Sequence, residues 1–400
     1  MARRKPAATT RKPKVRARPG VRPIPSSVVA PGDDRPPVEV QTTLGESTSD
    51  EPQALVVSHW FDSGQTGEPY AATIRLTGRR LGVHGQPRAG DTFAQDDKVE
   101  SIIPGSGAIS VTSTVYGLQR GEWTVTADLI RPTEHAAQPA DRWRRQTSER
   151  LPRAKWSWLR RRLTDGDANA VPTRWALIAP LARIPAVIPG SFTLLGTFAI
   201  ATAVTVISMV LARDGVPIAD SLLVSILALI SGLVGAKLWY AVLHPGSWRY
   251  AFGGWSVDGF LVVAPVVAMG ALVTLHLPIG SYLNAAAPAI FLAVAIGRFG
   301  CFFTGCCAGR CTASRWGVWS SDRRIGARRI PAQLLESAVG LSIALVSLGL
   351  VASRFGSGSG EVFLVAIAAY FIARQFLLRA RAERREFSWR RSPLVSRERS

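Results

Sequence analysis

Six apolar stretches in the second half of the chain limit most strongly what it can fold into. Each is close to the roughly 20 residues that a helix needs to cross the hydrocarbon core of a bilayer. Within that core, only helices and closed barrels satisfy every backbone hydrogen bond. The stretches cover approximately residues 190–212, 219–243, 257–276, 283–303, 331–353 and 361–378. The sequence therefore predicts an all-α polytopic membrane bundle of about six transmembrane helices.

A different pattern precedes the bundle. Residues 53–132 alternate between apolar and polar side chains with the period of a strand, as in Trp123, Val125, Ala127 and Leu129. This alternation predicts an N-terminal all-β, sandwich-like domain. The stretch 115–125 resembles the last hairpin of a fibronectin type III domain, and an unrelated β-sandwich fits the same residues.

The remaining segments are rich in basic residues. Residues 1–52 are basic and Pro-rich and are predicted to be disordered. Residues 133–189 combine Arg with Trp, which is typical of a juxtamembrane linker lying on the membrane. The membrane domain itself is predicted to cover 190–381, and residues 382–400 form a basic tail.

The net charge of +20 is concentrated at the two ends and in the connecting segments. Nucleic-acid binding is a common reason for so basic a chain, but the sequence contains no zinc-finger spacing, ribonucleoprotein motif or basic dimerisation helix. Long uncharged stretches flanked by cations instead favour a membrane with anionic headgroups as the partner. We therefore expect anionic lipid as a partner and no nucleic acid.

The same charges bear on orientation. With six spans, the basic even-numbered connections lie on the same side as both termini, whereas the connections at Arg213 and at 354–361 are almost neutral. The positive-inside rule then places both termini of a multi-pass plasma-membrane protein in the cytoplasm. No cleaved signal peptide is expected, because residues 1–50 contain no apolar run.

Polar side chains within the spans gather at one end of the predicted bundle. Ionisable groups at membrane depth are costly, so such a gathering indicates a functional site. The residues concerned are His244, Asp258, Arg298, Gln333, Glu336, Arg374 and the cysteines that follow the fourth span.

The densest segment, residues 297–310, carries a resemblance. It reads Gly-Arg-Phe-Gly-Cys-Phe-Phe-Thr-Gly-Cys-Cys-Ala-Gly-Arg. This segment resembles the signature Gly-Arg-x-Gly-Asn-Phe-x-Asn-x-Glu-x-x-Gly of the prolipoprotein diacylglyceryl transferase family. Residues 232–240, 253–259 and 329–336 resemble further segments of that family in the same order. The resemblance covers residues 190–381.

The resemblance implies a reaction without a cofactor or metal ion. In this family, the cysteine thiol of a lipoprotein precursor attacks the glyceryl carbon of phosphatidylglycerol, and glycerol phosphate leaves. Arg298 matches the family's essential arginine and would bind the lipid phosphate through its planar fork. By the same resemblance, further substrate-binding candidates are Arg374, Arg329, Gln333, Glu336 and Tyr240.

The sequence also departs from the family pattern. Asp258 stands where the family has histidine, Cys301 and Thr304 replace two asparagines, and Cys306 replaces a glutamate. Asp258 is a candidate base if burial raises its pKa, or else a helix-capping residue, and His244 is a second candidate base. The family's seventh span has no counterpart after residue 381.

All four cysteines, Cys301, Cys306, Cys307 and Cys311, fall within eleven residues. They could form a disulfide, a metal site, or an acylated or redox-active thiol site, although buried cysteines most often serve as small packing residues. Their spacing, C-x4-C-C-x3-C, fits no standard zinc pattern.

Three hypotheses for the function remain: a diacylglyceryl transferase, a catalytically silent lipid-binding scaffold, and a membrane protein whose function rests on cysteine chemistry. The family's pocket faces outward, whereas the charge rule turns the same end of this bundle towards the cytoplasm.

Overall fold

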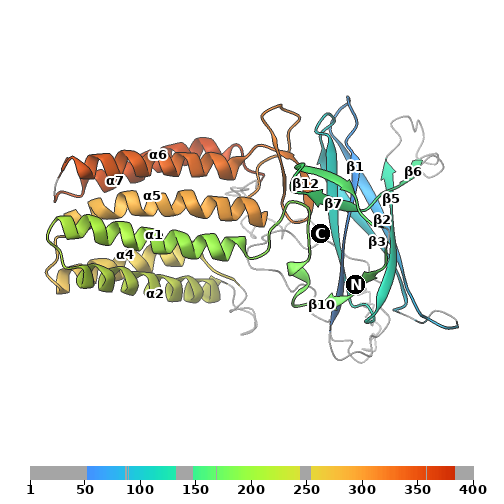
Figure 1. Ribbon diagram of the computed structural model, residues 1–400, viewed down its shortest axis with the longest axis horizontal. Helices are drawn as coiled ribbons and strands as arrows, with labels where there is room; N and C mark the ends of the chain where they lie inside the picture. The colour runs from blue at the N-terminus through green and yellow to red at the C-terminus, as the bar shows by residue number, and fades with distance from the viewer. Residues whose placement is uncertain are drawn as a thin grey trace, which may run out of the picture.

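The computed structural model describes residues 52–131 except 86, 87 and 89, residues 147–243 except 168, and residues 254–382 except 357. A bundle of long helices lies beside a region of strands, and the two meet at one end of the bundle (Figure 1). The predicted disordered and basic tails and His244 lie outside the described residues, apart from Pro52 and residue 382.

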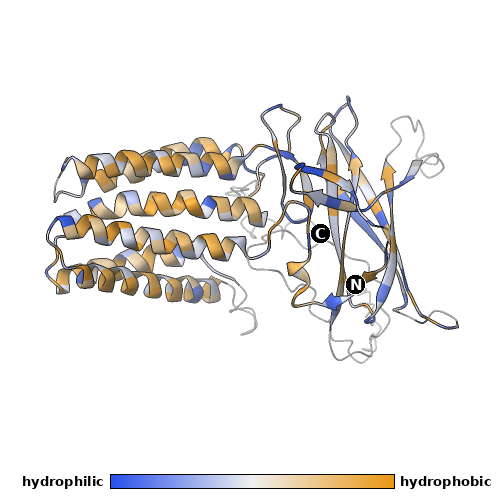
Figure 2. Cartoon of the chain, viewed as in Figure 1, coloured by the Kyte–Doolittle hydropathy of each residue, from blue (hydrophilic) through white to orange (hydrophobic). Residues whose placement is uncertain are grey.

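Six helices are each long and apolar enough to cross a membrane, which confirms the predicted membrane bundle. They are α1 (Ser191–Arg213), α2 (Ile218–Leu243), α4 (Val257–Thr274), α5 (Ile279–Thr304), α6 (Ala332–Ala352) and α7 (Glu361–Leu378). The helices consist largely of apolar residues along their length (Figure 2), and many of their large apolar side chains are exposed, such as Leu194, Val266 and Leu364. An apolar outer face is what a bundle surrounded by lipid tails requires.

The helices pack as two unequal groups. α5 packs extensively on α1 and α6, and α7 packs on α5 and α6. α2 and α4 form a separate pair, in which Gly232 and Gly235 of α2 lie against Phe260 and Val263 of α4. The pair joins the other helices through a buried cluster that includes Leu211, at the end of the bundle away from the strands. Small residues at the contact allow the backbones of the pair to approach closely.

The strands form two antiparallel sheets and a separate hairpin. One sheet has the order β10 (Arg174–Trp175), β1 (Gln53–Asp62), β4 (Ala108–Tyr116), β12 (Ile325–Arg329) and β11 (Val318–Ser321). The other has the order β3 (Thr92–Ile102), β2 (Tyr70–Arg80), β5 (Glu122–Arg131) and β6 (Thr147–Arg150), with β9 (Val171–Pro172) also on β5. β7 (Ala154–Ser157) pairs with β8 (Arg162–Asp165), and a short 3-10 helix, η1, covers Ala179–Leu181. Side chains of both larger sheets, among them Leu55, Ile74 and Trp123, share one buried core.

The β region extends further along the chain than the sequence predicted. Residues 147–175 contribute strands β6 to β10, although this stretch was expected to belong to a linker lying on the membrane. These strands are only two to four residues long and rich in Arg and Trp, so they show no alternation from which strands could be predicted. An N-terminal β-rich region is confirmed, and the fibronectin type III resemblance stays a prediction.

A hairpin from the membrane half completes the first sheet. β11 and β12 belong to the connection between α5 and α6, and β12 pairs with β4 through Ile325 opposite Val111. The indole of Trp319 stacks on Trp156 with ring centroids 4.4 Å apart, and its Nε1 donates to the carbonyl of Ala108 at 2.8 Å. These contacts fix the connection against the β region.

Candidate functional site

The site begins at the end of α5, where the chain reverses. Gly305 adopts a left-handed conformation with φ 75°, the amide of Cys306 donates to the carbonyl of Cys301 at 3.1 Å, and that of Gly305 to Phe302 at 3.3 Å. This pair of bonds is a Schellman C-cap, in which glycine avoids the strain of a side chain. A Cβ on Gly305 would lie 2.6 Å from the carbonyl oxygen of Ser321. The turn therefore requires glycine, and it brings the following residues back beside Cys301.

Three thiols meet at this turn. The Sγ atoms of Cys301, Cys306 and Cys307 all lie within 4.8 Å of one another. Cys301 is buried and the other two are partly buried. Cys307 has a positive φ of 53°, which is strained for a residue with a side chain and directs the chain away from the helix. Cys311 takes no part in this group; it forms a β-bridge with Arg329 and packs against the core of the β region.

Hydrogen bonds among the thiols shift the pKa values of Cys306 and Cys307 in opposite directions. Cys306 and Cys307 follow the membrane-spanning part of the chain. Hydrogen bonds with Cys301 and Cys306, assisted by the nearby charges of Arg381 and Arg298, lower the pKa of Cys307 well below its usual range. Hydrogen bonds with Cys301 and Cys307, together with burial, raise the pKa of Cys306. The cluster therefore favours a thiolate on Cys307, accepting hydrogen bonds from neutral neighbours.

Beside the thiols, a buried carboxylate joins two arginines. Glu336 of α6 is 1% exposed, and its Oε2 lies 2.7 Å from Nε of Arg298 on α5. Arg381, just after α7, binds the same carboxylate with two parallel bonds, Nε to Oε1 and Nη2 to Oε2, each 2.8 Å long. Two cations around one carboxylate leave one unit of positive charge in a nearly dry environment. A net positive charge in such a place can bind an anion.

Backbone contacts hold Arg381 in place. The amide of Arg310 donates to the carbonyl of Ala380 at 2.9 Å, and the amide of Ala382 donates to Ala308 at 3.1 Å. Nε2 of Gln333 also donates to the carbonyl of Cys306 at 2.9 Å. The loop after α5 is thus held by α6 on one side and by the end of α7 on the other. Arg381 was not among the predicted site residues; its position as the second arginine after the sixth apolar stretch was the available signal.

Arg329, predicted to bind substrate, is 4% exposed and bonds to protein groups. Its Nη1 donates to the carbonyl of Gly309 at 3.0 Å, and its Nη2 lies 2.8 Å from Oδ2 of Asp322. Its Nε is buried without a partner in the described part of the chain. These contacts give Arg329 a role in fixing the loop to the hairpin, and its contact with substrate stays a prediction.

Arg374 is connected to Arg298 through a tyrosine. Its Nη1 lies 3.4 Å from the hydroxyl of Tyr370, which also interacts with the guanidinium of Arg298. Tyr370 is held by a ring contact with Phe291, at 5.2 Å between centroids. Arg374 is partly exposed, so it lies along one side of the same site.

Two predicted residues lie on the other helix pair. Asp258 is in the first turn of α4, exposed, with no side-chain bond to another described residue. Tyr240 of α2 has its ring against Gly254, and neighbouring Lys237 lies 4.2 Å from the ring centroid of Trp255. The structure therefore places these two residues on the α2–α4 pair, whereas the arginines and thiols lie on α5, α6, α7 and the loop after α5.

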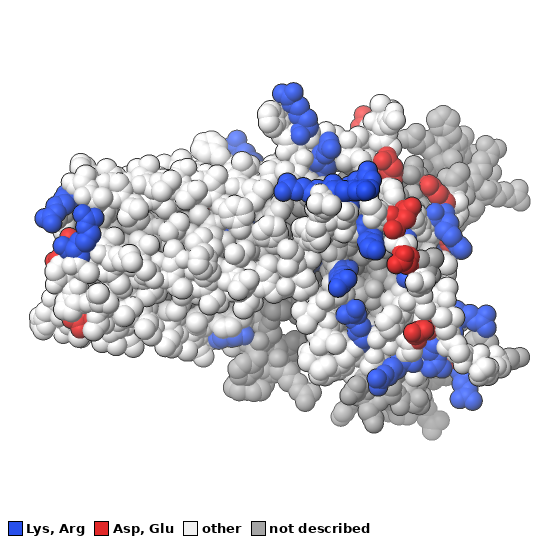
Figure 3. All heavy atoms as spheres, viewed as in Figure 1, with Lys and Arg blue, Asp and Glu red and all other residues white. Residues whose placement is uncertain are grey.

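Basic residues surround this end of the bundle. Lys and Arg gather where the bundle meets the β region, while the length of the bundle is almost free of charge (Figure 3). The connection between α5 and α6 contributes Arg310, Arg315, Arg323, Arg324 and Arg328. Cations at this level lie where lipid phosphates would be.

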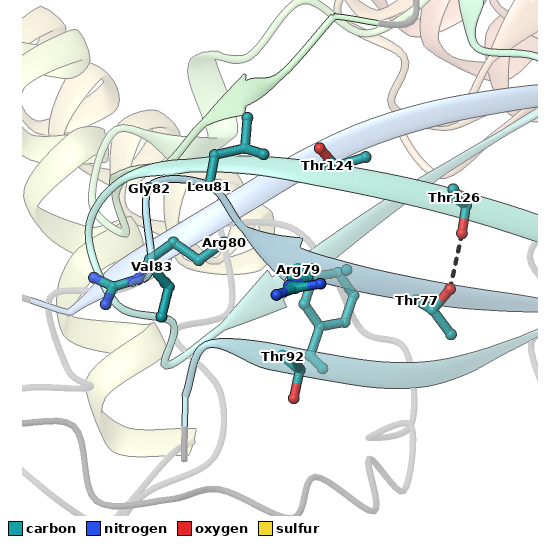
Figure 4. A pocket seen from close by; sticks show the side chains of 11 residues that line it. Thr77, Arg79, Arg80, Leu81, Gly82, Val83, Thr92, Thr124 and Thr126 are labelled. Carbon is teal, nitrogen blue, oxygen red and sulfur yellow. Dashed lines mark hydrogen bonds between the residues drawn. The ribbon is translucent and has the colours of Figure 1, made fainter. Parts of the chain in front are cut away.

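A hollow lies on the β region. It has a volume of about 580 Å³ and is lined by residues of β2, β3 and β5, including Arg79, Thr92 and the hydrogen-bonded pair Thr77 and Thr126 (Figure 4). It contains none of the residues that carry the family pattern and lies away from the helices. The candidate site is therefore the cluster at the end of α5.

The six apolar helices and their buried cluster of arginines, glutamate and thiols define a polytopic membrane protein with a cationic site at one end of its bundle. The family model for prolipoprotein diacylglyceryl transferase matches residues 183–396, more than half of the chain, and the chain belongs to this family.

Similar proteins carry the corresponding name. Phosphatidylglycerol–prolipoprotein diacylglyceryl transferase 2 of Streptomyces coelicolor is 30% identical over 168 residues, 38% of this chain and 53% of that protein. Transferase 1 of the same organism is 30% identical over 181 residues, 41% of this chain and 51% of its own. The enzyme of that name from Dehalococcoides mccartyi is 28% identical over 157 residues, 36% of this chain and 59% of its own. The chain thus spans about half the length of the curated relatives it matches.

Proposed function

We propose that this protein transfers a diacylglyceryl group from phosphatidylglycerol to the cysteine thiol of a lipoprotein precursor, in a bacterial plasma membrane. The observation that carries the proposal is the ion pair between Arg298, in the segment that resembles the family signature, and Glu336 of α6, both within the residues that the family model matches. The proposal also draws on the names of the similar proteins.

The cluster suits the charge changes of this reaction. The phosphate of the lipid bears one negative charge before transfer and gains another as glycerol phosphate leaves. Arg298 and Arg381 present a net positive charge at 17% and 9% side-chain exposure, so they are accessible yet poorly hydrated. Hydrogen bonds from such cations strengthen as negative charge develops on the leaving phosphate. Arg374 adds a third cation along the same side.

The test is transfer of a radiolabelled diacylglyceryl group from phosphatidylglycerol to a peptide containing the lipoprotein acceptor cysteine. We expect Arg298→Ala to lower transfer by about 100-fold or more, because it removes the fork that stabilises the leaving phosphate. Arg298→Lys keeps the charge without the fork and should also be impaired. Arg354→Ala is the matched control, since Arg354 lies exposed at the opposite end of the bundle.

The departures from the family pattern favour one alternative, a catalytically silent lipid-binding scaffold. Asp258, at the position of the family's histidine, lies exposed on α4, and thiols replace an asparagine and a glutamate. If folded, membrane-inserted wild type binds phosphatidylglycerol but leaves the peptide unlabelled, the transferase proposal is wrong and the scaffold remains.

If wild type is active, Asp258→Asn and His244→Gln are the next variants, since both residues remain candidate bases. If one of these residues is the base, its substitution should lower transfer and leave the binding of phosphatidylglycerol unchanged.

A further inference from the structure

The three thiols at the end of α5 lie close to the separation that a metal ion requires. Zinc–sulfur bonds of about 2.3 Å in a tetrahedral site put the sulfur atoms about 3.8 Å apart. The Sγ atoms of Cys301, Cys306 and Cys307 already lie within 4.8 Å of one another. The spacing in the sequence did not suggest this, because the Schellman turn brings together residues that are five apart.

The backbone around the thiols is fixed in advance. Gln333 binds the carbonyl of Cys306, the cap bonds hold Cys306 to Cys301, and Gly305 is confined by Ser321. A site whose ligands are held by packing and hydrogen bonds loses little freedom when a metal ion binds.

The charges and donors point to one class of ion. Three thiolates are soft ligands, which select zinc or cuprous ions over magnesium or calcium. With Zn²⁺ they carry one net negative charge, which the nearby guanidinium groups of Arg298 and Arg381 offset in part. Three protein ligands leave the fourth position of a tetrahedral ion open, as in catalytic rather than structural zinc sites.

We propose that Cys301, Cys306 and Cys307 bind one Zn²⁺ ion, and that its fourth position receives the thiol of the acceptor peptide. This inference rests on the proposed transferase function and explains how the acceptor thiol would be activated as the nucleophile. A thiol bound to zinc is deprotonated at neutral pH. The chain has aspartate instead of the family's histidine, and the metal ion would supply the missing activation.

Each bond that forms in this transfer is matched by a bond that breaks. The acceptor thiol displaces water from zinc and releases its proton to solvent. An electron pair of the bound sulfur then forms the bond to the glyceryl carbon, while the carbon–oxygen bond to the phosphate breaks. That bonding pair leaves on the phosphate oxygen, next to Arg298 and Arg381, as glycerol phosphate. The product sulfur is a neutral thioether, a poorer ligand than the thiolate, so it leaves the zinc and water returns.

The first measurement is zinc content of the full-length protein, purified in reducing buffer and reconstituted into lipid nanodiscs. We expect one zinc per chain in wild type, and zinc affinity lower by about tenfold or more in Cys301→Ser, Cys306→Ser and Cys307→Ser, because each removes a ligand. Cys311→Ser is the matched control and should keep the zinc, since Cys311 packs against the β core. Wild type without zinc, or equal zinc in all four variants, overturns the site.

The second measurement tests the open position without using activity. Cobalt replaces zinc in the protein, and its absorption reports thiolate ligands and their number. Adding the acceptor peptide should increase the sulfur-to-cobalt absorption, whereas a peptide with serine in place of the acceptor cysteine should not. An unchanged spectrum overturns the assignment of the acceptor thiol to the fourth position.

The two proposals fail separately. Transfer that survives in Cys301→Ser, Cys306→Ser and Cys307→Ser, or after zinc is stripped by a chelator, overturns the zinc inference and leaves the transferase intact. A zinc-loaded protein whose cobalt form responds to the peptide but which transfers no label sinks the proposed reaction and keeps the thiol-binding metal site. A disulfide among the three cysteines in protein isolated from untreated membranes contradicts the zinc inference.

Discussion

Glu336 determines the charge balance of the candidate site. It is 1% exposed and accepts ionic bonds from Arg298 and Arg381, which come from different parts of the chain. A buried charge without its partner costs much more than a surface pair contributes. The same carboxylate therefore keeps two cations buried near the membrane surface and in position for an anionic headgroup.

Replacing Glu336 by Gln should destabilise the bundle strongly. Both arginines would lose their anionic partner, at a cost of about 3–5 kcal/mol. Thermal unfolding of the two proteins in the same detergent measures the effect. Glu361→Gln, an exposed carboxylate at the start of α7, is the control and should cost less than about 1 kcal/mol. Equal stability of Glu336→Gln and wild type would show that Glu336 does not balance the charges of the two arginines.

His59 should make the stability of the β region depend on pH. Burial, with a smaller effect of nearby Arg153, lowers the pKa of His59 from 6.5 to about 4. Between these values the unfolded chain binds a proton that the folded chain does not, so the free energy of unfolding falls as pH falls. The contribution is complete above 6.5, and about 3 kcal/mol is lost by pH 4.

Denaturant unfolding followed by tryptophan fluorescence across that pH interval tests the prediction. His59→Gln should flatten the pH dependence, and His84→Gln, at an exposed position, should leave it as in wild type. A wild-type profile without a decline towards acid would contradict it.

Most residues of the cluster could be predicted from the sequence, but Arg381 could not. Arg298, Gln333, Glu336 and the thiols were found because they lie in segments that resemble a known signature. Arg381 was missed because its position depends on bonds between the loop after α5 and the end of α7, which no local pattern records. The sequence also did not reveal that Asp258 lies on a separate helix pair.

Helices and strands whose sequence signal is local were predicted well, whereas strands that depend on a remote partner were not. The ends of the six helices fall within a few residues of the predicted stretches, because hydrocarbon thickness fixes the length of an apolar run. The long strands β1, β2 and β5 show the alternation of a half-buried sheet. β11 and β12 were missed because β12 pairs with a strand that is remote in sequence, and because the residues of both strands resemble a basic loop.

Trp319→Ala should loosen the hairpin of β11 and β12. The substitution removes the stack on Trp156 and the hydrogen bond to Ala108, together about 2 kcal/mol. Trypsin cleavage after the arginines of this connection should then be about 30-fold faster, since cleavage follows the population of the open form. Trp316→Ala is the control, because Trp316 lies in the same connection and is 75% exposed. Similar cleavage of both variants would count against the role of Trp319.

At the scale of the whole molecule, the pairing of β12 with β4 fixes relative sidedness. The β region and the thiol cluster must lie on the same side of the membrane, because one sheet contains strands from both halves of the chain. The positive-inside rule places the basic end of the bundle in the cytoplasm, whereas the pocket of the family faces outward. This conflict cannot be resolved by placing the β region on one side of the membrane and the thiol cluster on the other.

Labelling with a membrane-impermeant maleimide measures this sidedness. A cysteine replacing Glu100, whose side chain is 71% exposed on the β region, should react from one side only. A cysteine replacing Arg354, exposed at the far end of the bundle, should react only from the other. Wild type gives the background of the native thiols, and labelling of both positions from one side would disprove the arrangement.

The shared sheet also has a consequence for biosynthesis. Ala108 and Trp319, which are hydrogen-bonded in the finished protein, are 211 residues apart, and four membrane helices are made between them. Until the ribosome has passed that point, β4 presents an unpaired edge that invites aggregation. If one of those helices failed to insert, the hairpin would emerge on the wrong side and the edge would stay open. A chain with such an insertion error would therefore keep an open strand edge, which the correctly inserted chain closes with β12.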